Sequence, residues 1–195
     1  LFEEGFTDPE TGGVVVNADA LQVYGGWRVL TARPSGAEEA RVPHRLYGHV
    51  PVSQGHSTGR WLREVARILA ESHAAGRRPI FVGGSGLLFA ALTEGLAEIP
   101  ETPKKIRGLL DARLAAEGLH PLVAELRRRD PATAARLDLA NPRRVLRALE
   151  VLETTGKALS AWQAETPPPL VPAAHRLRLA PPPAVLARRI ETRFD

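Results

Sequence analysis

The chain has 195 residues, of which 44% are hydrophobic and 25% are charged, with 26 Lys and Arg against 22 Asp and Glu. This length allows one sizeable core, or a core with a small subdomain. No apolar run approaches the roughly 20 residues of a membrane span, and no signal-peptide pattern opens the sequence. The absence of cysteine excludes disulfides and thiolate metal sites. We therefore expect a soluble, cytoplasmic protein.

The first expected element is a buried β-strand over 14–16. Three consecutive valines form a run that is too short and too uniform for an amphipathic helix and is typical of a parallel strand. Asn17 and Asp19 follow where the run stops, at the edge where open α/β sheets bind ligands. Asn and Asp are also common caps, so a functional carboxylate and a turn cap both remain open for Asp19.

A loop and a helix are expected next. Residues 36–56 predict a long surface loop, because proline, glycine and histidine interrupt every apolar pattern there. Ser57 or Thr58 then caps a helix with an apolar stripe at helical spacing, and Gly76 ends it.

A second strand leads into a glycine-rich turn. Residues 79–82 predict a buried strand, and 87–93 an apolar helix, so the strand–helix order implies a parallel sheet with a right-handed crossover. Between them, Gly83, Gly84 and Gly86 would let a ligand approach the backbone, and helix N–H groups attract anions. A tight turn with packing glycines explains the same residues.

From residue 99 to 165 the pattern indicates helices only. Thr102, Asp130 and Asn141 each precede a proline, as a capping residue does when proline takes the first helical position. Gly118 and Gly156 supply stop signals. We expect four or five short helices that form an inserted helical subdomain.

The rest of the chain predicts a return to the core. The Pro-rich stretch 166–174 is typical of an extended linker. His175–Ala180 predicts a strand, and a helix is expected from about 183 to 194. The predicted organisation is an α/β core over 1–98, a helical insertion over 99–165, a linker over 166–174 and a return to the core over 175–195.

Arginines gather on one predicted helix. Arg147 lies four residues after Arg143 and three after Arg144, so two or three guanidinium groups could converge on nucleic-acid phosphates. Glu150 could instead pair with Arg147 or Arg143 on an ordinary solvated face. The sequence leaves both alternatives open.

The six histidines do not indicate a metal site. No His-x₃-His or His/Glu pair has metal-ligand spacing, so no protein zinc site is expected. No residue is assigned as a metal ligand from the sequence.

Eight segments resemble those of the bacterial tRNA dimethylallyltransferase (tRNA isopentenyltransferase) family, in the family's order and approximate spacing. Together they span nearly the whole chain, from about Val14 to Phe194, and eight in register are specific although each alone is weak. The segments are VVNADALQVY at 15–24, TARP at 31–34, PHRL at 43–46, PIFVGGSGLLFAAL at 79–92, Pro100-x₆-Arg107, DPATAARL at 130–137, NPRRVLRALEVLETTGKALS at 141–160 and RIETRF at 189–194.

The resemblance implies an α/β fold, a P-loop-NTPase-like parallel-sheet core with an inserted all-helical subdomain. It implies a transferase that moves a dimethylallyl group from dimethylallyl diphosphate to N6 of the adenosine 3′-adjacent to the anticodon in tRNA. The implied partners are the tRNA anticodon stem-loop and dimethylallyl diphosphate, with Mg²⁺ as cofactor and no membrane. A monomer is expected.

The resemblance also implies roles for individual residues. Asp19 matches the aspartate that accepts the N6 proton, which is general-base work for a well-placed carboxylate. Arg193 matches a residue that stabilises the diphosphate together with Mg²⁺, and Ser85 lies in the turn next to the bound nucleotide. Gly83, Gly84 and Gly86 belong to that turn. The segments that match tRNA-contacting parts of the family supply Asp19, Ala20, Leu21, Gln22, Ser85, Arg107, Arg143, Arg144, Val145, Leu146 and Arg147.

The chain departs from the family pattern at several points. The family's P-loop, Gly-x₄-Gly-Lys-Ser/Thr, occurs nowhere in the sequence, which contains no methionine and begins with leucine. Ala20, Gly25 and Leu88 stand where the family usually has serine, a basic residue and tyrosine. We therefore expect a fragment without the P-loop and the C-terminal region, which by itself binds dimethylallyl diphosphate poorly or not at all. A P-loop small-molecule kinase and a non-catalytic RNA-binding remnant are the alternatives.

Overall fold

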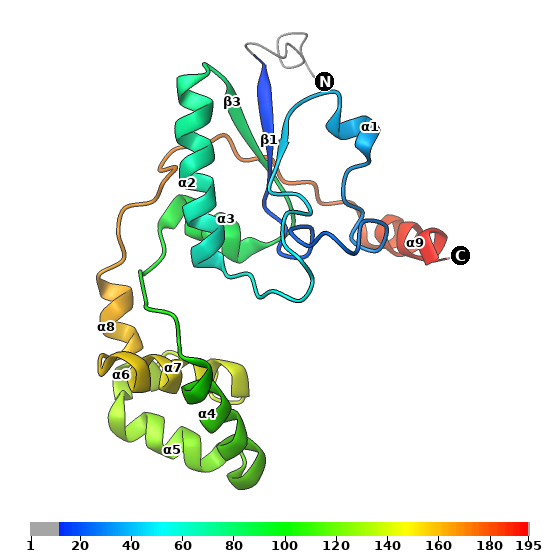
Figure 1. The fold of residues 1–195 in the computed structure, drawn as a ribbon. Helices are drawn as coiled ribbons and strands as arrows, with labels where there is room; N and C mark the ends of the chain where they lie inside the picture. The colour runs from blue at the N-terminus through cyan, green and yellow to red at the C-terminus, as the bar shows by residue number, and fades with distance from the viewer. Residues whose placement is uncertain (1–11, 195) are drawn as a thin grey trace.

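The computed structural model describes residues 12–194, which form an α/β core joined to a separate group of helices (Figure 1). The core contains a parallel sheet with the strand order β2–β1–β3. Strand β1 spans Gly13–Asn17, β2 spans His44–Arg45 and β3 spans Arg78–Val82. Because β1 pairs in parallel with both neighbours, it occupies the centre of the sheet. The predicted α/β fold with a parallel sheet is confirmed.

The two predicted buried strands differ in their burial. Val14 and Val16 of β1 lie in the core, as expected for a strand with neighbours on both sides. The expectation that β3 is also buried is wrong. Its residues are exposed or half-exposed, and Val82 is 48% exposed. The reason is that β3 has a hydrogen-bonded neighbour on one side only among the described strands.

Helix α2, Thr58–Ala74, covers the sheet and confirms the predicted amphipathic helix. Ser57 Oγ accepts a hydrogen bond from the Arg60 N–H at 3.2 Å, which caps the first turn. Trp61, Val65 and Ile68 form its buried face and pack with β1 and with α3, Gly86–Glu94. Burial of each such side chain contributes about 1.5–3 kcal/mol relative to exposure.

The sequence predicts a single long loop over 36–56, and this expectation is wrong. The segment contains the short helix α1, Gly36–Glu39, with a capping box formed by Ser35 and Glu38, and it contains β2. A further bridge joins Tyr24 to Val50. A two-residue strand leaves no periodic pattern in the sequence, because its partners decide it.

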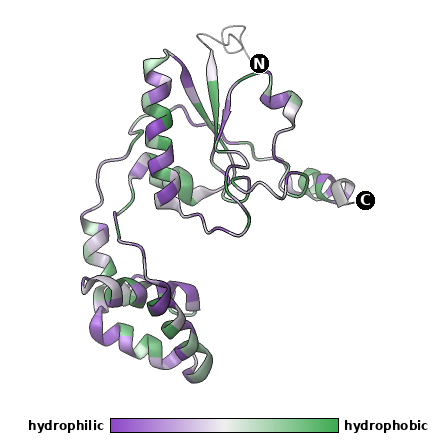
Figure 2. Ribbon diagram, viewed as in Figure 1, coloured by the Kyte–Doolittle hydropathy of each residue, from purple (hydrophilic) through white to green (hydrophobic). Residues whose placement is uncertain are grey.

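Five helices between residues 104 and 164 form a second group with its own core (Figures 1 and 2). Buried residues of this group include Leu122, Leu126 and Leu149, and none of its core residues belongs to the sheet's cluster. The predicted helical insertion is therefore present, whereas the domain boundaries stay a prediction. The helices are α4 at Lys104–Glu117, α5 at Leu119–Arg129, α6 at Pro131–Ala134, α7 at Pro142–Thr155 and α8 at Leu159–Ala164.

Two of the three predicted caps are present in this group. Asn141 Oδ1 accepts from the N–H groups of the first turn of α7, and Asp130 Oδ1 accepts from the Thr133 N–H at 3.0 Å. The buried Asp130 also accepts from the Leu159 N–H, which joins α6 to α8. Thr102 does not cap α4. Its hydroxyl oxygen accepts a hydrogen bond from Arg147 instead.

The returning chain lacks the strand predicted over His175–Ala180. Leu177 and Leu179 have the alternation of a strand but are 97% and 96% exposed, and neither belongs to the described sheet. A strand requires a hydrogen-bonded neighbour, and none of the three described strands pairs with this segment. Helix α9, Pro183–Phe194, follows as predicted. Among residues 12–194, every helix is too short or too polar to span a bilayer.

The ion pairs of Glu125 lead to a prediction about stability. Burial opposes ionisation of Glu125, but hydrogen bonds from Arg129 and then Arg113 outweigh it and lower the pKa of the carboxyl. Glu125→Gln should therefore reduce the free energy of unfolding at pH 7 by about 1 kcal/mol. A lowered folded-state pKa contributes stability above the pKa of the unfolded chain, and this contribution is lost as the pH falls through the folded value. Urea unfolding at pH 7 and pH 3 measures both.

The control is Glu117→Gln, since the more exposed Glu117 contacts only Arg113 among the described residues, at 3.2 Å. Its effect should be smaller. An equal loss for Glu125→Gln at both pH values would contradict the prediction.

Candidate functional site

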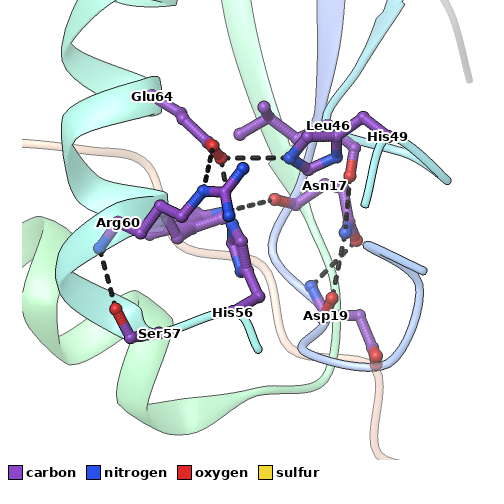
Figure 3. A network of polar contacts seen from close by, with 9 residues as sticks. Asn17, Asp19, Leu46, His49, His56, Ser57, Arg60 and Glu64 are labelled. Carbon is purple, nitrogen blue, oxygen red and sulfur yellow. Dashed lines mark hydrogen bonds and ion pairs between the residues drawn. The ribbon is translucent and has the colours of Figure 1, made fainter. Parts of the chain in front are cut away.

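The candidate site lies at the carboxyl ends of β1 and β3, around the buried side chain of Asn17 (Figure 3). Its Nδ2 donates to the carbonyl oxygens of Asp19 at 2.9 Å and Leu46 at 3.1 Å. Its Oδ1 accepts from the Asp19 N–H at 2.9 Å, and its backbone oxygen accepts from the Trp61 indole at 2.8 Å. One residue thus joins the end of β1 to the chain after β2 and to α2.

Asp19 uses its two carboxylate oxygens differently. Oδ1 accepts from the N–H groups of Leu21 at 2.8 Å and Gln22 at 3.2 Å, so it caps the following turn. Oδ2 faces the glycine-rich turn, since a Cβ built on Gly84 would lie 3.4 Å from it. Both roles that the sequence left open for Asp19 are therefore compatible with this geometry.

The turn over Gly83–Gly86 packs directly against the Asp19 turn. Ser85 Oγ accepts from the Ala20 N–H at 2.9 Å, and the Ser85 N–H donates to the Ala18 oxygen at 3.2 Å. Gly83 permits this contact, because a Cβ there would lie 2.2 Å from the Ala18 carbonyl carbon and oxygen. The structure therefore brings together the residues of the two turns that the sequence analysis singled out.

The other residues of the Asp19 turn have mixed roles. Ala20 and Leu21 are exposed, whereas the Gln22 amide donates to the carbonyl oxygen of Thr31 at 2.8 Å and so braces the following loop. Tyr47 was not predicted as a site residue from the sequence. Burial, and then the negative charges of Asp19 and Glu39, raise the pKa of Tyr47 to about 12. Its phenol therefore stays protonated at neutral pH.

The predicted tRNA-binding arginines lie in the helical group and not at the Asp19 turn. Arg143 and Arg144 occupy the exposed first turn of α7, and Arg143 pairs with Asp111 at 3.3 Å. Glu150 forms ion pairs with the other two arginines, and its pairing with Arg147 agrees with the alternative interpretation of this helix. It pairs with Arg147 at 3.5 Å and with Arg107 at 3.7 Å.

Three predicted site residues need correction or fall outside the description. Val145 and Leu146 are 0% and 1% exposed and pack in the helical core, so their side chains cannot contact tRNA unless that core opens. Helical periodicity places them on the face opposite to Arg143 and Arg144. The side chain of Arg193 lies outside the described part of the chain, so its role stays a prediction.

A second polar cluster beside Asn17 was not predicted from the sequence (Figure 3). His49 Nε2 and His56 Nε2 each lie 3.0 Å from Glu64 Oε2, and the Arg60 Nε donates to Glu64 Oε1 at 3.1 Å. Partial burial raises the pKa of Glu64, but hydrogen bonds from His56, His49 and Arg60 outweigh it and lower the pKa. The spacings of seven and eight residues match no local ligand pattern, so only the fold reveals this cluster.

Comparisons with known proteins agree on one family. A profile described as IPP transferase matches residues 22–195. The tRNA dimethylallyltransferase of Cereibacter sphaeroides (strain ATCC 17029 / ATH 2.4.9) is 62% identical over 186 residues, which are 94% of this chain and 57% of that protein. That of Dinoroseobacter shibae is 57% identical over 185 residues, 94% of this chain and 60% of that protein. The chain thus spans little more than half the length of these relatives.

A solved structure extends the comparison. A eukaryotic dimethylallyltransferase acting on tRNA superposes with a TM-score of 0.66 at 27% identity and covers 79% of this chain and 38% of its own. The likeness agrees with the α/β core and helical group described above.

The close contact at Gly83 leads to a second prediction. Gly83→Ala should reduce the free energy of unfolding by about 3 kcal/mol, because the added Cβ collides with backbone atoms that cannot rotate away. Gly86→Ala is the matched control, since a Cβ there meets no heavy atom within 4 Å. Urea unfolding of both variants measures the difference. Equal stabilities would show that the two turns do not pack as described.

Proposed function

This chain belongs to the IPP transferase family, and we propose that it contributes the site that deprotonates the acceptor base in a tRNA dimethylallyltransferase. The proposed reaction transfers a dimethylallyl group from dimethylallyl diphosphate to N6 of the adenosine next to the anticodon. One observation carries the proposal. Two backbone N–H groups fix Asp19 through Oδ1, and Oδ2 faces the Gly83–Gly86 turn.

The chemistry of the transfer explains why such a carboxylate is needed. The N6 amine is a poor nucleophile, because its lone pair is delocalised into the adenine ring. N6 bonds to C1 of the dimethylallyl group, the C1–O bond breaks, and its electron pair leaves with the diphosphate. Asp19 accepts the proton released from N6. Oδ2 is the better placed oxygen, since Oδ1 already accepts two hydrogen bonds.

The Gly83–Gly86 turn is proposed to lie beside the donor. Ser85 holds this turn against Ala20, so the carboxylate and the start of α3 keep a fixed separation. Ser85 offers a hydroxyl oxygen beside the proposed donor position, and oxygen is the ligand type that Mg²⁺ prefers, so this turn fits the implied ion. Mg²⁺, held largely by the diphosphate, would neutralise charge on the leaving group. Arg193 is proposed to stabilise the same group.

The helical group is proposed to bind the tRNA. Arg143 and Arg144 lie exposed in the first turn of α7, where the positive end of the helix dipole also favours anions. The target adenine must leave the anticodon-loop stack before the Asp19 carboxylate, at the edge of the sheet, can reach its N6. A tRNA held by the helices and a base inserted at the Asp19 turn account for both groups of residues.

A chimera tests the proposal at full family length. Residues 12–194 replace the matching segment of the Cereibacter sphaeroides relative, and mass spectrometry detects prenylated adenosine after incubation with Mg²⁺, dimethylallyl diphosphate and unmodified tRNA. The chimera should be active, and Asp19→Asn should lower its turnover by about 10²–10⁴-fold. Asp138→Asn is the control, because Asp138 also caps a turn through Oδ1, with the Ala140 N–H at 3.1 Å, and lies away from the site.

Two outcomes would contradict the proposal. The first is an inactive, folded chimera beside an active Cereibacter protein. The second is equal turnover of the Asp19→Asn and Asp138→Asn variants. Binding of tRNA without turnover would favour the non-catalytic RNA-binding alternative.

The arginines of α7 give a separate prediction for tRNA binding. The double variant Arg143→Ala/Arg144→Ala should weaken binding of an anticodon stem-loop and reduce the slope of log affinity against log salt by about 0.7–0.9 for each phosphate that the variant no longer neutralises. Fluorescence anisotropy between about 50 and 200 mM salt measures this slope. Arg127→Ala/Arg128→Ala removes the same charge from exposed positions of α5 and should change the slope little. Equal changes for both pairs would contradict a specific role for α7.

A further inference from the structure

We propose that His49, His56 and Glu64 form a binding site for one divalent transition-metal ion of the Zn²⁺ type. One ligand atom from each side chain, two imidazole nitrogens and one carboxylate oxygen, lies within 4.8 Å of the other two. This donor set matches zinc sites with three protein ligands and a fourth position for water. The site is independent of the proposed prenyl transfer.

The geometry already approaches that of a coordinated ion. Both His Nε2 atoms aim at the same oxygen, Glu64 Oε2, at 3.0 Å (Figure 3). A tetrahedral Zn²⁺ holds nitrogen and oxygen ligands at about 2.0–2.2 Å, which separates neighbouring ligand atoms by about 3.3 Å. An ion therefore fits among the three groups after small side-chain shifts, and it takes the place of the two imidazole protons that now lie between them.

The three ligands lie on hydrogen-bonded backbone next to β1 and on α2. Gly48 and Val50, on either side of His49, donate their N–H groups to the Gln22 and Val23 oxygens at 2.9 Å. His56 directly precedes the residue that caps α2, and Glu64 lies in the second turn of that helix. The ligands thus come from positions that the fold fixes, so little conformational entropy is lost when an ion binds.

The burial and charge of the cluster also suit an ion. The side chains of His56, Glu64 and His49 are 5%, 16% and 28% exposed, so the site is enclosed on one side and open at His49. Arg60 contacts only the other carboxylate oxygen, Oε1, and leaves Oε2 for the ion. Its side chain is 42% exposed, so water screens its charge.

A bound ion would fasten the chain between β2 and α2 onto α2. The connection between β2 and α2 begins at Leu46, whose backbone oxygen accepts a hydrogen bond from the Asn17 amide. The ion would therefore support the same loop that the Asn17 amide supports, and it should raise the unfolding temperature of the protein.

Metal titration of the 195-residue chain, purified without a histidine tag and freed of metal with EDTA, tests the site. Co²⁺, followed by its visible absorption, and ZnCl₂, followed by calorimetry, should each bind at one ion per chain. His49→Ala, His56→Ala and Glu64→Gln should each weaken binding by more than the roughly 100-fold that loss of an outer-shell partner can cost. His73→Ala should leave binding unchanged, because His73 is an exposed histidine on the same helix.

X-ray absorption of the zinc-loaded wild-type chain tests the ligand set without any variant. Two imidazole nitrogens and at least one oxygen in the first shell are expected. The proposal is overturned by the absence of saturable one-to-one binding, by fewer than two imidazoles in the first shell, or by folded ligand variants that bind as the wild type does. Circular dichroism verifies the fold of each variant. Because no tRNA or diphosphate is present, these outcomes are separate from those that test the proposed transfer.

Discussion

The buried amide of Asn17 is the constraint on which the arrangement at the edge of the sheet depends. A buried amide that loses its partners costs about 1–3 kcal/mol, so its hydrogen bonds must all be made at once. They are made to Asp19 on one side and Leu46 on the other. Leu46 has a φ of +62°, a conformation that a leucine rarely adopts, and the bond to its carbonyl oxygen helps to hold it there. The Asn17 amide therefore ties the Asp19 turn both to the end of β1 and to the chain after β2.

Trp61 extends this constraint into the hydrophobic core. Its indole donates to the Asn17 backbone oxygen, and its ring is buried against Phe81 of β3. The packing that stabilises α2 on the sheet thus also fixes the position of the Asp19 turn relative to the sheet. Because His56 directly precedes the residue that caps α2, and α2 carries Glu64, the polar cluster beside the site is positioned by the same helix. Core packing and site geometry cannot change separately here.

The candidate functional residues are distributed over two parts of the molecule, each with its own hydrophobic core. The sheet and its helices carry the carboxylate and the glycine turn, while the helical group carries the exposed arginines and packs around a core of its own. The chain that returns from α8 lies along α3, since the Val171 N–H donates to the Leu92 oxygen at 3.0 Å. Gly95, with a φ of +95°, lets the outgoing chain pass beside the returning one, where a Cβ would lie 2.4 Å from the Pro167 oxygen.

The sequence by itself determined the elements whose signals are local. Three valines predicted β1, the stripe from Trp61 to Ile68 predicted α2, and the caps at Asp130 and Asn141 marked two helix starts. It also placed Asp19 at the ligand-binding edge of the sheet and the Gly83–Gly86 turn directly after the next predicted strand. The two turns meet because parallel strands end on the same side of a sheet. Tertiary structure alone decided which apolar runs became buried strands. Val82 and the 175–180 segment carry strand patterns, yet burial and pairing depend on neighbours that no local pattern encodes.

The difference between local and tertiary signals also explains why the Asp19 site was predictable from the sequence and the cluster of His49, His56 and Glu64 was not. Asp19 follows a strand closely, so its position was predictable. The burial of Val145 and Leu146 in α7 follows from helical periodicity once the core face of the helix is known. His49, His56 and Glu64 come from a loop, a helix start and a helix turn, and the hydrogen bonds of the Gly48–Val50 backbone to 22–23 bring them together. Such a convergence has no signature at any fixed spacing. Only the folded chain, which closes the loop over α2, decides it.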